Sequence, residues 1–184
     1  MADILEAIQW DHANLAKLLD AMEAQLDRFD RGEDPDYDIL RGVAEYCLNY
    51  PDLYHHPAED LLLRRLRVRD PEGAAMVGAL DAEHQTLSAK VHRFRDALDE
   101  VLKDLELPRA AFVALARDFV ASYRLHMRKE EETFLPAAAR ALSLQDRAEV
   151  SAEAGPRTDP LGDGAQEEFE ALREKLMRWA RESA

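Results

Sequence analysis

The sequence predicts an all-α protein: an up-down-up-down antiparallel four-helix bundle with an additional C-terminal helix. Four long segments place apolar residues at alternating spacings of three and four, the pattern of a helix that buries one face. Short joints that contain Gly, Pro and acidic residues separate these segments, so consecutive helices are expected to run antiparallel. We expect the bundle to occupy residues 1–142 and an extension to occupy residues 143–184.

The first two helices are expected at about residues 2–30 and 36–69. The buried face of the first helix has a regular heptad of apolar residues that contains one histidine, His12. The second helix contains Pro51 and Pro57, and each proline removes a backbone hydrogen bond. A bend or a local shift of register is therefore expected in the second helix.

The third and fourth helices are expected at about residues 72–105 and 108–142. Nine positions from Val77 to Leu105 keep the three-four spacing without a break, again with a single histidine, His84. The fourth helix also has a regular apolar face, but two polar residues interrupt it.

Beyond residue 142 the pattern changes. Ser143 is expected to cap a short helix through Val150, and a last helix is expected at about residues 165–181. This last helix has an apolar stripe, and soluble proteins rarely leave so much contiguous apolar surface exposed. We therefore expect it to dock on its own chain or across a homodimer interface, so that the protein is a monomer or a homodimer. The stripe consists of Phe169, Leu172, Leu176 and Trp179.

Composition excludes several classes of partner. The 184 residues include 24 Lys and Arg against 38 Asp and Glu, a net charge of −14. Phosphate contacts need clustered basic residues, so nucleic acid and anionic membranes are not expected as partners. Cys47 is the single cysteine, which rules out an internal disulfide and a thiolate metal cluster. The sequence shows no signal peptide and no apolar run of about 20 residues, so a cytoplasmic location is expected.

The fourth helix carries an unusual pair on its apolar face. His126 and Glu130 are four residues apart and therefore point the same way. An imidazole and a carboxylate in an apolar environment are costly unless they are satisfied, and a metal ion satisfies both. His55 and Glu59 repeat the same spacing in the second helix, and the first and third helices each supply one histidine.

Counting residues from each helix joint places these groups at one depth of the bundle. The distances from these groups to the joint that connects two adjacent helices differ by less than about two helical turns, at ~1.5 Å per residue. The six candidate metal ligands are therefore His12, His55, Glu59, His84, His126 and Glu130.

Each group also has a structural interpretation. A lone histidine on a buried face is commonly a hydrogen-bonded core residue, and a His-x-x-x-Glu pair is commonly exposed. The combination favours metal binding, because two carboxylates would otherwise be buried without a cation. Nitrogen and oxygen donors of this kind suit iron, manganese or zinc rather than calcium or a soft metal.

These residues resemble the hemerythrin-like family with its HHE cation-binding domain. The resemblance extends over about residues 1–142. It rests on His12, the stretch Tyr54-His55-His56-Pro57-Ala58-Glu59-Asp60, Glu83-His84, and His126-Met127-Arg128-Lys129-Glu130-Glu131.

The resemblance implies a non-haem di-iron centre inside the bundle. His12, His55, His84 and His126 would be terminal ligands of two iron ions. Glu59 and Glu130 would bridge the ions together with an oxo or hydroxo group. An open coordination position would then bind a small molecule: dioxygen, nitric oxide or peroxide.

Three functions remain open at this stage. The first is a di-iron protein that binds or reacts with those small ligands, with or without catalytic turnover. The second is iron storage, donation or sensing without turnover. The third is an interaction module in which the acidic surface and the last helix matter most.

Two departures from the oxygen-carrying members of the family argue against reversible oxygen carriage. Ser88 stands where those proteins have a fifth histidine, and Glu130 replaces an aspartate found one residue later. Of the neighbouring residues, His56 is expected either at the periphery of the site or directly behind a ligand, and His92 is expected in solvent. Tyr123 is expected as a core tyrosine, with a hydrogen-bond donor or phenolate ligand as alternatives. Glu131 is expected on a solvated face, where it can orient a ligand imidazole, and Cys47 is expected to be buried and inert.

Overall fold

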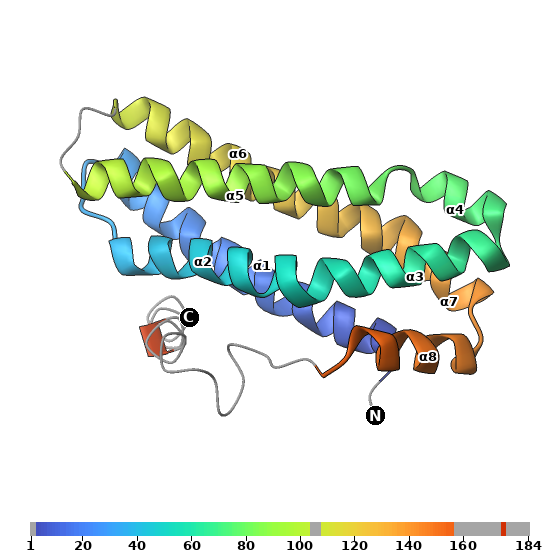
Figure 1. The fold of residues 1–184 in the computed structure, drawn as a ribbon. Helices are drawn as coiled ribbons and strands as arrows, with labels where there is room; N and C mark the ends of the chain where they lie inside the picture. The colour runs from blue at the N-terminus through green and yellow to red at the C-terminus, as the bar shows by residue number, and fades with distance from the viewer. Residues whose placement is uncertain (1–2, 104–107, 157–173, 176–184) are drawn as a thin grey trace.

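The computed structural model describes residues 3–103, 108–156 and 174–175. Over these ranges the chain is helical and has no β-strand (Figure 1). The prediction of an all-α protein is confirmed. None of the described helices combines the length and the apolar character that a membrane crossing requires.

Four long helical rods make up most of the molecule. Rods 2 and 4 are each interrupted by a short π-helical turn, and two shorter helices lie outside the rods. Rod 1 is α1 (Ile4–Asp30); rod 2 is α2 (Tyr37–Asn49), η1 (Pro51–His55) and α3 (His56–Arg69); rod 3 is α5 (Leu80–Leu102); rod 4 is α6 (Arg109–Lys129), η2 (Glu130–Phe134) and α7 (Leu135–Ala141); the outer helices are α4 (Pro71–Val77) and α8 (Leu144–Ala154).

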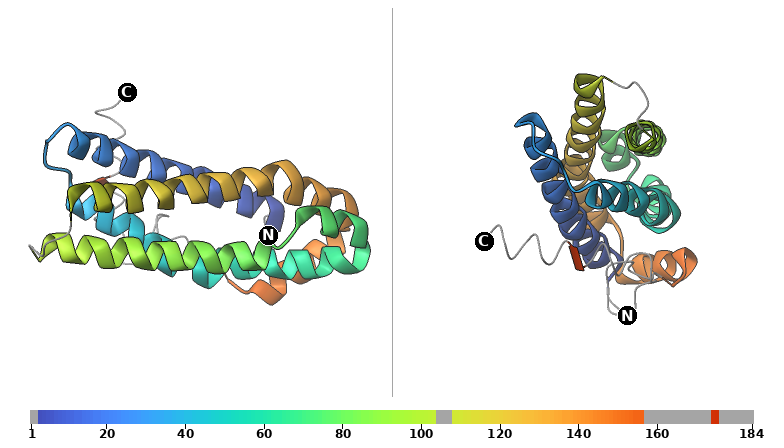
Figure 2. Two further views of the ribbon diagram at one scale, coloured as in Figure 1. Left: turned by 90° about the horizontal axis from the view of Figure 1, so that it is seen from above. Right: turned by 90° about the vertical axis from the view of Figure 1, so that its left-hand side faces the viewer.

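The rods enclose a common core. Rod 1 packs against rods 2 and 4, and rod 3 packs against the same two, so the contacts form a closed ring. Figure 2 shows this arrangement along the bundle axis, and Figure 1 shows that the end of α1, the start of α2, the end of α5 and the start of α6 lie at one end of the molecule.

Side-chain caps and glycines set several helix ends. Asp3 accepts a hydrogen bond from the Leu5 amide at 3.1 Å at the start of α1. Asp36 accepts from the Asp38 amide at 3.0 Å at the start of α2. Gly32 has a φ of 83°, a conformation that a side chain would strain, and it turns the chain between the two helices.

The expected third helix over residues 72–105 is wrong in its first part. The chain forms α4, breaks, and starts again as α5. Gly78 has a φ of 84°, which allows the break at little conformational cost. The end expected near residue 105 lies outside the described residues.

The π-helical turns in rods 2 and 4 have the same cause. Pro57 and Pro136 each lie two residues after a π-helical turn, and a proline ring clashes with the carbonyl four residues earlier. The wider turn relieves that clash: the His56 amide donates to the Pro51 carbonyl, and the Leu135 amide donates to the Glu130 carbonyl. The shift of register expected near Pro51 and Pro57 is thus present, and an equivalent one occurs in rod 4.

The apolar core is divided into two clusters with a polar layer between them. On rods 1 and 3, one cluster ends before the candidate histidine and the other begins after it, whereas on rods 2 and 4 the change from one cluster to the other falls within the stretch that contains the histidine and the glutamate. The residues that flank the layer are Ile8 and Leu15 on rod 1, Tyr50 and Ala58 on rod 2, Leu80 and Leu87 on rod 3, and Met127 and Phe134 on rod 4. The fold therefore holds the candidate ligands at one depth and shields them on both sides.

The helix α8 closes one end of the bundle. Ser143 caps it through a reciprocal pair of hydrogen bonds with Asp146, as the sequence predicts, although the helix continues to Ala154. Val150 is buried, and α8 packs against α3 and α1. Asp146 also accepts a 2.8 Å hydrogen bond from Arg69 of α3. The division of the chain at residue 142 stays a prediction.

The expected last helix at residues 165–181, with its apolar stripe, lies outside the described residues apart from residues 174–175. Lys175 donates to Asp38 at 2.5 Å and to Asp36 at 3.2 Å, at the start of α2. Docking of the stripe on its own chain or on a second copy stays a prediction.

Candidate metal centre

The structure brings all six candidate ligands together in the polar layer. Each is at most 6% exposed, and both glutamates are completely buried. Rods 1 and 3 contribute one histidine each, and rods 2 and 4 contribute a histidine and a glutamate each. The six residues are His12, His55, Glu59, His84, His126 and Glu130.

Glu59 lies between two pairs of histidines. Its Oε1 atom is 3.4 Å from Nε2 of His55 and 3.7 Å from Nε2 of His12. Its Oε2 atom is 3.4 Å from Nε2 of His84. The two oxygens of the Glu59 carboxylate therefore face different histidines: Oε1 faces His12 and His55, and Oε2 faces His84.

Glu130 divides its oxygens in the same way. Its Oε2 atom is 3.2 Å from Nε2 of His12, whereas Oε1 is 3.0 Å from Nε2 of His126 and 3.5 Å from Nε2 of His84. The layer thus contains two positions for a cation. The first position lies beside His12 and His55, the second lies beside His84 and His126, and each receives one oxygen from each glutamate.

Each ligand histidine has a carboxylate at its other ring nitrogen. These four outer carboxylates leave Nε2 as the nitrogen that faces the glutamates. The Nδ1 distances are His12 to Glu131 at 3.2 Å, His55 to Asp11 at 3.0 Å, His84 to Asp60 at 3.2 Å, and His126 to Glu83 at 3.5 Å.

The outer carboxylates link the rods in a closed cycle. Each of these carboxylates is directly next in the chain to a candidate ligand of its own rod and contacts a histidine of the next rod. The pairs are Asp11 of rod 1 with His55 of rod 2, Asp60 of rod 2 with His84 of rod 3, Glu83 of rod 3 with His126 of rod 4, and Glu131 of rod 4 with His12 of rod 1. Sequence reasoning considered Glu131 for this role and missed Asp11, Asp60 and Glu83. The available signal was an acidic residue directly beside each of these ligands.

The inner atoms of the layer fit a metal. Among the described residues, Nε2 of His12, His84 and His126 and all four oxygens of Glu59 and Glu130 are buried without a hydrogen-bond partner. Two buried carboxylates without a cation are strongly unfavourable. Imidazole nitrogens and carboxylate oxygens within 4.8 Å of one another supply the donor set of iron, manganese or zinc.

The glutamates also control the protonation of two histidines. Burial acts to lower the pKa of His12, but Glu130 and Glu59 outweigh it and raise the pKa to about 10. Burial opposes a raised pKa at His84 too, and Asp60, Glu130 and Glu59 raise it to about 11. Without a metal, therefore, protons on these two rings balance the buried carboxylates.

Metal binding is consequently expected to release about two protons near pH 7, one each from His12 and His84. A ring nitrogen must lose its proton before it coordinates, and both rings are protonated below pKa values of about 10 and about 11. Apparent affinity should therefore rise as pH increases through the neutral range. Calorimetric titration in buffers of different ionisation enthalpy measures the number released. Binding without proton release, or with an affinity independent of pH, would contradict this assignment.

Of the two expectations for His56, the structure excludes a place at the periphery and agrees with a place directly behind a candidate ligand. His56 is 4% exposed, and its ring stacks on that of His84 with centroids 4.2 Å apart and planes at 12°. Burial lowers its pKa to about 4, so the ring is neutral at pH 7. His55 ends the π-helical turn η1 and His56 begins α3, and both side chains are buried.

The remaining candidates lie as expected. His92 is exposed, and the buried thiol of Cys47 has its pKa raised by burial, which keeps it protonated. Tyr123 belongs to the larger apolar cluster, with its ring 5.1 Å from that of Phe119. Ser88 is partly buried and donates a 2.6 Å hydrogen bond to Asp52.

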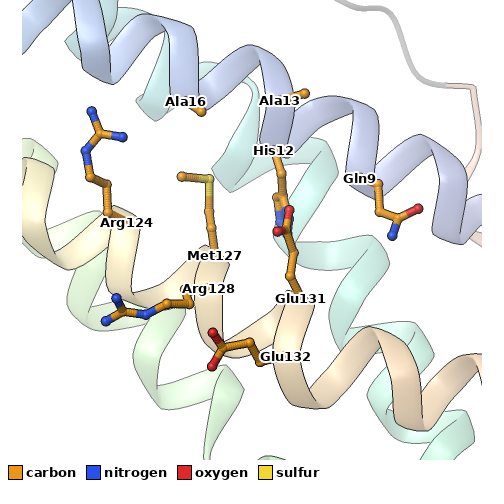
Figure 3. A pocket seen from close by; sticks show the side chains of 9 residues that line it. All are labelled: Gln9, His12, Ala13, Ala16, Arg124, Met127, Arg128, Glu131 and Glu132. Carbon is orange, nitrogen blue, oxygen red and sulfur yellow. The ribbon is translucent and has the colours of Figure 1, made fainter.

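A cleft between rod 1 and rod 4 lies beside His12. It has a volume of about 310 Å³, and Figure 3 shows Glu131 beside His12 within it. Glu131 is 51% exposed at its side chain, whereas His12 is only 2% exposed, so Glu131 lies between the His12 ring and solvent. The lining residues are Gln9, His12, Ala13, Ala16, Arg124, Met127, Arg128, Glu131 and Glu132.

Comparison with protein-family models identifies a family for this chain. The model described as the hemerythrin HHE cation binding domain matches residues 3–138. The matched range contains all six candidate ligands and the four outer carboxylates, and it ends before α8. The chain has no significant match among curated proteins or among solved structures.

Proposed function

The chain belongs to the hemerythrin family of HHE cation-binding domains, and on this premise we propose that it is a non-haem di-iron protein that binds or reacts with dioxygen, nitric oxide or peroxide. One observation carries the proposal: each of two buried glutamates directs one oxygen to each of two histidine pairs. This is the arrangement that two bridging carboxylates need.

In the proposed site, His12 and His55 hold one ion and His84 and His126 hold the other. Glu59 and Glu130 bridge the two ions. When bound, the ions supply redox chemistry and a coordination position for the small ligand. We further propose that the four rods form the antiparallel up-down-up-down bundle expected from the sequence.

The protein contributes orientation and exclusion of water. Glu131, Asp11 and Glu83 accept hydrogen bonds from Nδ1 of His12, His55 and His126 and so leave Nε2 of these rings free to coordinate. Tyr50 extends this support by donating a 2.9 Å hydrogen bond to Asp11, the partner of His55. The apolar clusters above and below the layer limit solvent access, and the cleft beside His12 offers a small molecule a route to the first position.

Iron storage, donation or sensing without turnover is the second candidate function. The observation that favours it is the location of both glutamates in the middle of the core, since metal loading then controls the stability of the whole bundle. A sensor of this kind responds through unfolding of the metal-free form. It does not require a reaction at the bound ions.

An optical spectrum with metal analysis tests the proposal. The purified protein should carry iron, its oxidised form should absorb in the near ultraviolet as an oxo-bridged ferric pair does, and the spectrum should change on reduction and on exposure to oxygen or nitric oxide. Protein that holds only tetrahedral zinc would refute the proposal. Iron-loaded protein whose spectrum does not change on exposure to oxygen or nitric oxide would favour the second candidate function, iron storage or sensing.

A further inference from the structure

A fifth histidine enters the polar layer beside the second position. His56 offers a ligand atom within 4.8 Å of those of Glu59, His84 and His126, and all four residues are buried. Its ring centroid lies 4.2 Å from that of His84 and 5.8 Å from that of His126. Rod 2 therefore directs two consecutive histidines into the layer, one toward each position.

The surroundings of His56 repeat those of the other four histidines. Its Nδ1 atom lies 3.2 Å from Oδ1 of Asp52, which leaves Nε2 as the nitrogen available to a cation. The other oxygen of Asp52 accepts the 2.6 Å hydrogen bond from Ser88 of rod 3. A side-chain carboxylate thus orients this imidazole as well, and a serine on the neighbouring rod fixes that carboxylate.

We propose that His56 is a third histidine ligand of the second metal position, and that Asp52 and Ser88 are its positioning residues. The inference rests on the proposed two-metal site and makes that site asymmetric. The second position then has His56, His84 and His126, whereas the first has His12 and His55 alone. The first position is left with more room for a small ligand, and it is the one beside the cleft.

Stepwise binding of Co²⁺ to the metal-free protein tests this inference, because the cobalt absorption bands report coordination number as well as occupancy. Wild-type protein should bind two equivalents. His56→Ala should bind the first equivalent normally and the second at least about 100-fold more weakly, and Asp52→Asn should weaken the second about 10-fold. His92→Ala removes an exposed histidine of rod 3 and should match the wild type.

A relocated histidine separates loss of a ligand from loss of packing. Ser88 lies one helical turn after His84 on rod 3 and already contacts Asp52. In the double variant His56→Ala, Ser88→His, an imidazole returns to the second position from rod 3, and the second equivalent should recover at least about 10-fold of its affinity. A purely structural role for His56 predicts no recovery.

The possible outcomes separate this inference from the function on which it rests. Wild-type protein that binds fewer than two ions would overturn the two-metal site itself. If the wild type binds two ions, and His56→Ala keeps both affinities and the same cobalt spectrum, the two-metal site stands. Only the role of His56 as a ligand would then be overturned. If His56→Ala does not fold, Asp52→Asn decides, and an unchanged second equivalent in that variant would overturn the inference.

Discussion

Glu130→Ala is expected to leave the protein without metal at either position, whereas Glu131→Ala is expected to retain both ions. Glu130 is completely buried and its oxygens lie 3.0–3.5 Å from His12, His84 and His126, so its removal takes one ligand from each ion. Glu131 contacts only the outer nitrogen of His12 and is half exposed. Loss of such an outer contact typically costs about 10- to 100-fold in affinity, which excess metal overcomes.

Metal analysis after reconstitution and desalting measures the difference. Glu130→Ala should hold less than about a tenth of the wild-type iron, in line with the loss of a ligand shared by both ions. Glu131→Ala should hold most of it. These neighbours are a matched pair, because both substitutions remove a glutamate from the same helical turn. Equal iron content in the two variants would show that the buried face of rod 4 has been wrongly assigned.

Metal loading is expected to raise the melting temperature by about 8–16 °C. The ions bind the folded protein and not the unfolded chain, and a free metal concentration 1,000-fold above Kd contributes about 4 kcal/mol. A chain of this length gains about 2–4 °C for each kcal/mol. We expect this gain in stability because a bound cation stabilises Glu59 and Glu130, which are buried and lack hydrogen-bond partners among the described residues.

Scanning calorimetry of metal-free and loaded protein measures this change. Glu130→Ala serves as the control, since its melting temperature should not respond to metal. A wild-type melting temperature that is the same with and without metal would mean that protonated His12 and His84 stabilise the buried carboxylates as well as a metal does. It would also remove the basis for iron sensing through bundle stability.

Helical periodicity was sufficient to predict that the six candidate ligands share one layer. His12 and His84 interrupt apolar stripes whose spacing fixes their direction, and helix lengths fix their depth. The break at Gly78 was missed because Val77 and Leu80 continue the same apolar spacing on both sides of it. The spacing of apolar residues indicates which residues face the core, but it does not reveal a short interruption of the helix.

Two other features could not be predicted from positions along single helices. The outer carboxylates act across rods, so the distance between Asp11 and His55 depends on the packing of α1 against rod 2. The place of His56 depends on its packing against His84 of rod 3, which a count of 100° per residue along one helix does not describe.

The central claim is tested most directly by reconstituting the protein with isotopically enriched iron. The number of iron ions per chain and their magnetic state are then measured. Each chain should hold two ions, and Mössbauer spectra of the oxidised protein should show a coupled ferric pair, because Glu59 and Glu130 each reach both positions. One ion per chain, or two ions that behave as magnetically isolated ferric centres, would contradict the shared carboxylate bridge.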